Sequence, residues 1–149
     1  MRPLIVAVVC SVAASPAFAF AEPTEHRLSV PDLCRALEAR TINTTDRIAA
    51  RATFLVDMRH GNFIQPEGDC RRGIVFGIAP GSQAAAAWEK LERTMLGLDL
   101  GRKPKTVYLV LDNVVADLHG RAVCPLDIAQ RCEIEIDHLS KVTLPTLDQ

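Results

Sequence analysis

The sequence predicts a mainly β, single-domain protein in which three strands, a helix and two more strands follow a short N-terminal helix. The strand signal is clearest at 48–59, where inward and outward positions alternate over twelve residues. A helix is predicted at 82–96, where apolar residues recur at helical spacing after Ser82. The length of 149 residues, without internal repeats or linkers, predicts one folded domain at 30–142.

Composition narrows the function classes before any motif is considered. Hydrophobic residues make up 48% of the chain and charged residues 23%, which excludes a mainly disordered protein. The 17 basic and 18 acidic residues give a net charge of -1. That balance excludes a strong whole-protein attraction to nucleic acid or to anionic lipid.

The first 21 residues have the pattern of a secretory signal peptide. Arg2 precedes an apolar run at 4–14, which is too short to span a membrane, and small residues follow. Cleavage is expected after Ala21 or, alternatively, after Ala19; the other alternative is an uncleaved N-terminal anchor. Arginine outnumbers lysine 13 to 4, which suggests a GC-rich bacterial genome. We therefore expect an exported protein, periplasmic or secreted, without a transmembrane segment after cleavage.

Cleavage changes the cysteine count from five to four, because Cys10 leaves with the signal. An even number of cysteines in an exported chain predicts disulfides, and three pairings are possible. Cys124 and Cys132 enclose a short segment and are expected to pair, which leaves Cys34 with Cys70. The spacing resembles no zinc motif, so a metal site is the weaker interpretation, and we expect no cofactor.

The elements after the signal follow from turn chemistry and periodicity. Pro31 suits the first turn of a helix at 31–39, and Thr, Asn and Asp at 41–46 indicate a turn. Gly101 and Pro104 separate the central helix from the next strand, and alternating Glu and Ile begin the last one. The remaining predicted segments are a flexible leader at 22–29, strands at 63–65, 74–79, 106–116 and 133–142, a loop at 120–131, and a C-terminal tail at 143–149.

This order resembles the OB-fold, a five-stranded Greek-key barrel with a long first strand and a helix between strands three and four. The chain also resembles, loosely, a group of small exported bacterial OB-like proteins of unknown function. The resemblance rests on a cysteine in a short N-terminal helix, Asp32-Leu33-Cys34-Arg35, and a second one in Glu67-Gly68-Asp69-Cys70. It implies a five-stranded OB-like barrel but no specific function, since a fold does not fix function.

An OB-fold usually binds across strands two and three and the loops joining strands 1–2 and 4–5. Mapped onto this chain, that face predicts a ligand-binding set of Arg59, His60, Asn62, Arg71, Arg72, His119 and Arg121, the last two from the late loop. Arginine forks would hold an anionic or polar group. The alternative is that these residues are ordinary solvated loop charges.

We therefore expect a non-enzymatic binding module for another envelope protein or for a small polar or anionic ligand. Nucleic acid is an unlikely partner because few aromatic residues remain outside the predicted core to stack bases. One alternative is a small hydrolase or metal-dependent enzyme centred on His60 or His119, although no activated serine or free cysteine accompanies them. Another is a structural or stress-protective envelope protein.

Overall fold

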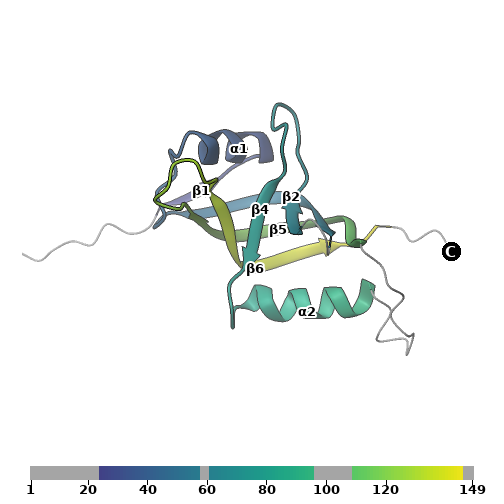
Figure 1. The fold of residues 1–149 in the computed structure, drawn as a ribbon. Helices are drawn as coiled ribbons and strands as arrows, with labels where there is room; N and C mark the ends of the chain where they lie inside the picture. Colours follow the sequence, from purple (N-terminus) through teal and green to yellow (C-terminus); the bar gives the residue numbers. More distant parts are fainter. Residues whose placement is uncertain (1–23, 58–60, 96–108, 146–149) are drawn as a thin grey trace, which may run out of the picture.

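The computed structural model describes residues 24–57, 61–95 and 109–145 (Figure 1). The predicted signal peptide at 1–21 lies outside the described residues. The elements in chain order are β1 (Glu25–Arg27), α1 (Val30–Glu38), β2 (Arg47–Asp57), β3 (Gly61–Ile64), β4 (Ile74–Ile78), α2 (Gln83–Met95), β5 (Leu109–Val123) and β6 (Glu133–Thr143). Neither helix in this part of the chain is long and apolar enough to cross a membrane.

Five strands close into a barrel. The order β2-β3-β4-β6-β5 returns to β2 through the β2–β5 pairing, and β4 pairs with β6 in parallel while the other four barrel pairings are antiparallel. The helix α2 lies between the third and fourth barrel strands. Figure 1 shows α1 and α2 on opposite sides of the strands. The predicted mainly β, OB-like barrel is thus confirmed, and so is the position of its helix.

The alternation along β2 places Phe54 in the core, where its ring meets two others edge-on. The ring centroids of Phe54 and Phe76 lie 5.1 Å apart, and Trp88 of α2 lies 5.9 and 5.3 Å from them. Ser82 caps α2 by accepting a hydrogen bond from the Ala85 backbone N–H. Phe54 and Trp88 therefore belong to the core.

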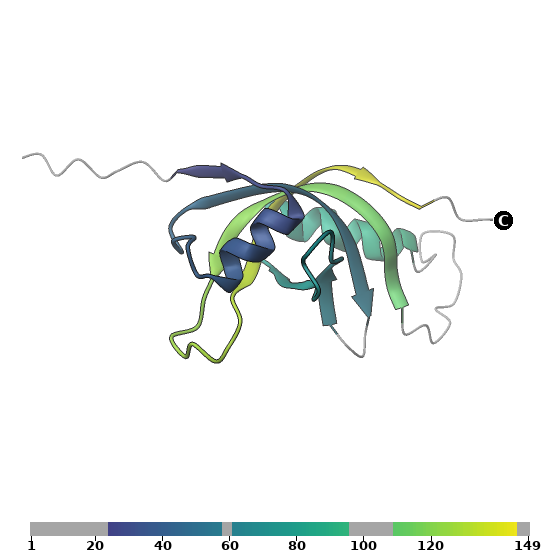
Figure 2. The same ribbon diagram turned by 90° about the horizontal axis from the view of Figure 1, so that it is seen from above.

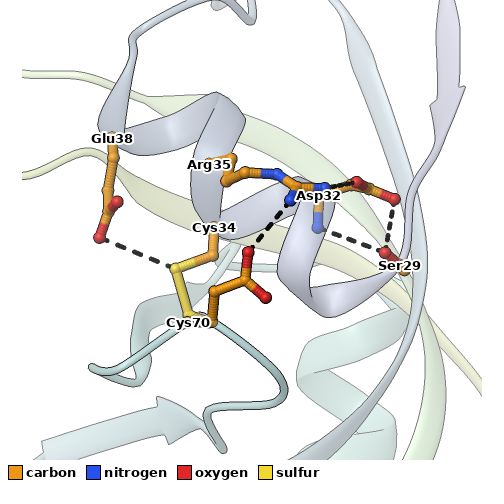
Figure 3. Close-up of polar contacts among 7 residues, drawn as sticks. Ser29, Asp32, Cys34, Arg35, Glu38 and Cys70 are labelled. Carbon is orange, nitrogen blue, oxygen red and sulfur yellow. Dashed lines mark hydrogen bonds and ion pairs between the residues drawn. A yellow bond between two sulfur atoms is a disulfide. The ribbon is translucent and has the colours of Figure 1, made fainter.

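Both predicted disulfides are present. Cys34 of α1 is bonded to Cys70 in the β3–β4 loop, and Cys124 is bonded to Cys132 between β5 and β6. Figure 3 shows how the first bond ties α1 to the neighbouring loop. Arg35 of α1 also donates a hydrogen bond to Asp69 Oδ2 in that loop, at 3.2 Å. The disulfide and the ion pair therefore fix the helix against the side of the barrel.

Two segments differ from the sequence expectation. Residues 25–27, within the expected flexible leader, form β1, which pairs in parallel with the start of β2. The loop predicted from residue 120 is wrong for 120–123, because β5 continues to Val123. A Cβ at Gly120 would lie 2.2 Å from the Glu135 backbone oxygen. The glycine is needed there for the close approach of β6.

Candidate functional site

The structure does not bring the sequence-predicted ligand set together on one face. Arg59 and His60 lie outside the described residues. Asn62 stands opposite Val56 near the end of β2, whereas His119 stands opposite Ala49 near its beginning. Seven residues of strand correspond to roughly 23 Å. Asn62 and His119 therefore belong to different regions of the surface.

His119 and Arg121 lie on β5 itself, not in a loop, and both have acidic partners. His119 Nδ1 is 3.0 Å from Glu25 Oε1, and Arg121 donates to Glu135 Oε1 at 2.7 Å. The His119 ring also lies edge-on to His138, with centroids 5.6 Å apart. No hydrogen bond among the described residues joins His119 to a serine, so the contact that would activate a nucleophile is missing from this part of the chain.

The predicted Arg72 lies instead beside a segment that the predicted ligand-binding set did not include, because both line one pocket. This segment runs between Cys124 and Cys132 and is called the disulfide loop below. Arg40, just after α1, donates to three of its carbonyl oxygens: Pro125 at 2.8 Å, Asp127 at 3.0 Å and Gln130 at 2.6 Å. The covalent bond and these three contacts hold the loop in one shape.

The disulfide loop is further ordered from within. The Asp127 carboxylate accepts from the Ala129 backbone N–H at 2.9 Å, and the Asp127 backbone oxygen accepts from the Gln130 N–H at 3.1 Å. Figure 2 shows the loop projecting beyond the barrel, at the lower left. Its tip is therefore both ordered and accessible.

Two large apolar side chains occupy that tip. Leu126 is 101% exposed and Ile128 is 85% exposed, well above the other large hydrophobic residues on the described surface. Single exposed apolar residues are common and need no explanation. Two of them, separated only by Asp127 on a cross-linked and hydrogen-bonded loop, present a preorganised apolar surface.

A pocket of about 180 Å³ lies beside the loop, between the end of α1 and the start of β4. Leu37, Val75 and Ile128 contribute apolar lining, while Arg72 and Arg131 bring positive charge. Arg71 is exposed next to Arg72. The structure thus places Arg72 at an apolar hollow, in a setting different from the polar face expected for it.

The pocket continues into an apolar row on the outer face of the sheet. Leu55 stands opposite Phe63, and Phe63 stands opposite Val75, which lines the pocket. All three are half-buried. In the sequence, Leu55 alternates with the core residues of β2, and apolar residues lie between Cys124 and Cys132. Both signals point to apolar surface, which a set of charged and polar residues does not include.

Several charged groups elsewhere on the sheet are paired with one another. The hydrogen bond from Arg47 holds the pKa of Asp137 below its usual range, against the opposing effect of partial burial. Within the described ranges, no group of three or more His, Cys, Asp or Glu side chains could hold a metal ion. In comparisons with known proteins, no protein-family model, curated protein or solved structure matches the chain.

Proposed function

We propose that this chain is an exported, non-enzymatic binding module that recognises another protein through the disulfide loop. The observation that carries the proposal is the exposure of Leu126 and Ile128 on a loop held by a disulfide and by Arg40. A loop already fixed in shape loses little conformational freedom on binding. Apolar residues that cluster at the centre of an interface supply much of its affinity.

The neighbouring surface supports a protein partner. The pocket beside Ile128 can accept a partner side chain, and the row through Val75 extends the apolar contact. Arg72 and Arg131 provide a polar rim around it. An apolar centre with a charged rim is the usual anatomy of a protein interface.

A lipid surface fits the loop less well than a protein does. Asp127 lies between Leu126 and Ile128 in the sequence, and it is exposed. Moving a carboxylate into hydrocarbon is costly, so the loop tip is poorly suited to membrane insertion. A protein cleft can take up the two apolar side chains and leave the carboxylate at its edge.

The test compares an L126S/I128S double variant with V142S. Val142 is 41% exposed and lies on β6, so its replacement removes apolar surface away from the loop. Immobilised mature protein would be exposed to envelope extract, and captured protein would be identified and quantified. We expect the native chain and V142S to capture the same partner.

Burying one Leu or Ile side chain contributes about 1.5–3 kcal/mol, so the double variant should bind at least about 100-fold more weakly. Thermal unfolding of both variants is the control, and exposed positions predict unchanged melting temperatures. Equal capture by the double variant and the native chain would show that the loop is not the contact.

A further inference from the structure

A second hollow lies on the outer face of the barrel, away from the disulfide loop. This outer groove has a volume of about 380 Å³ and lies across β1, β2, β5 and β6. That volume is within the range of small-molecule sites, about 300–1,000 Å³. The groove shares no lining residue with the pocket beside the loop. Its function can therefore be tested independently of the proposed protein contact.

The groove exists because β2 carries a small residue between two large ones. The outward positions at the start of β2 are Arg47, Ala49 and Arg51, because Ile48 and Ala50 belong to the core. Ala49 is 6% exposed yet is not part of the core cluster. It stands opposite Arg27 on one side and His119 on the other. Alanine is thus the floor of a hollow with larger side chains around it.

The lining of the outer groove carries an excess of positive charge. Arg27, Arg51 and Lys141 are cations, and Asp117 is the carboxylate among the lining residues. The Asp117 carboxylate already forms ion pairs with both Arg51 Nη1, at 2.7 Å, and Lys141 Nζ, at 3.0 Å. Arg27 is exposed and has no ion-pair partner within the part of the chain that the structure describes. With three cations and one carboxylate, the lining carries a net charge of +2, and Arg27 is its one cation without a carboxylate partner in the described residues.

An irregularity in β6 brings further donors to the same place. Successive residues of a strand normally point to opposite faces, but Ser140 and Lys141 both line the groove. Lys141 has a φ of 48°, and the pairing of β5 with β6 shifts register next to Asp117. This bulge turns the lysine to the outer face beside the serine hydroxyl. Bulges often redirect a side chain in this way near binding sites.

We propose that the outer groove binds a small anion through a carboxylate or phosphoryl group, held between Arg27 and the Ser140–Lys141 bulge. A guanidinium fork matches the paired oxygens of either group. The serine hydroxyl and the lysine ammonium supply donors from the opposite side. The floor at Ala49 sets the depth to which the anion enters.

The test is an amide NMR titration of the mature protein with sodium phosphate and, separately, with sodium succinate. Sodium chloride keeps the ionic strength constant, so charge screening is the same at every point of the titration. We expect saturable shifts at Arg27, Ala49 and Ser140 with at least one anion. Saturation with phosphate alone identifies a phosphoryl ligand, and saturation with succinate alone identifies a carboxylate ligand. Chemical shifts that saturate with neither phosphate nor succinate would overturn the proposal.

Three variants make the assignment specific. R27A should weaken binding about tenfold or more, the loss of one charge-assisted contact. K90A removes an exposed cation on α2, outside the groove, and its affinity should stay within about twofold of the native value. A49L should abolish binding by filling the groove without changing any charge.

The variants also define the opposing outcomes. Native affinity in R27A, or an equal loss in K90A, would show that no defined site exists. Retained binding in a folded A49L would show that the anion binds elsewhere. Should A49L fail to fold, R27A still decides, because Arg27 is exposed and its truncation leaves the core intact.

Discussion

Removal of the Arg40 side chain should loosen the disulfide loop without unfolding the barrel. The guanidinium is the one group in the described structure that bonds three carbonyls of the loop, and it does so from the end of α1. Arg40 has a φ of 53°, a backbone conformation that costs alanine and lysine about as much as arginine. Comparing R40A with R40K therefore isolates the side-chain contacts from the backbone.

The size of the effect follows from the three hydrogen bonds, at 2.6 to 3.0 Å. One hydrogen bond to a charged group contributes about 1.5–3 kcal/mol. The carbonyls of an exposed loop regain water when the arginine is removed, so the three bonds together are worth about one such bond. Opening of the loop should then be about 10- to 100-fold more frequent in R40A, with R40K between R40A and the native protein.

Hydrogen exchange at the Ala129 and Gln130 amides measures this opening, because both are bonded within the loop. The buried Ile134 amide of β6 is the internal control and should keep its native exchange rate. Unchanged exchange at Ala129 and Gln130 in R40A would refute the idea that Arg40 orders the loop. Faster exchange at Ile134 as well would mean that the barrel itself had been destabilised.

Three further predictions concern the barrel. G120A should lower the free energy of unfolding by about 3 kcal/mol or more, because its Cβ would meet the Glu135 backbone oxygen, whereas G77A, where a Cβ has nothing within 4 Å, should change it by less than about 1 kcal/mol. Urea unfolding followed by Trp88 fluorescence compares the two variants, and equal stability would contradict the packing argument. Because the pKa of Asp137 is lowered in the folded protein, its ion pair with Arg47 stabilises the fold fully above the unfolded pKa of about 3.9, and this stabilisation is lost as the pH falls through the folded pKa. Between pH 6 and pH 2.5, D137N should therefore lose less stability than the native protein, and equal losses in the two proteins would contradict this. Removing the Cys34–Cys70 disulfide, with a sequence separation of 36, should lower the free energy of unfolding by about 4 kcal/mol, and removing Cys124–Cys132, with a separation of 8, should lower it by about 2.5 kcal/mol. The reverse order in denaturant unfolding would argue against chain entropy as the cause.

The parts of the fold that could be predicted from the sequence are those with local signals. The alternation through Phe54 and the helical spacing around Trp88 each report which face is buried, and the barrel order follows from the sequence of elements. β1 has no such signal, because three residues are too few to show a period. It is held by distant partners, with His26 near Asp46 and Glu25 near His119. Contacts of this kind depend on the finished fold.

The candidate site was less predictable for a related reason. Ending the fourth barrel strand before Gly120 placed His119 and Arg121 in a loop, next to residues that lie at the other end of β2. Charge and hydrogen-bonding capacity then favoured arginine and histidine as site residues over Leu126 and Ile128. The solvent exposure of the side chains favours Leu126 and Ile128 over the charged candidates, and that exposure depends on where Arg40 and the disulfide hold the loop.

The two disulfides converge on one region of the molecule. Cys34 and Cys132 both line the pocket beside the disulfide loop, although the bonds that contain them join different elements. The outer groove has no cysteine in its lining and is held by ion pairs such as Arg51 with Asp117. Covalent cross-links are therefore concentrated where two apolar side chains face solvent, the place where a flexible segment would collapse or aggregate most readily. That distribution is expected if the disulfide loop must keep its shape in an oxidising compartment until a partner covers it.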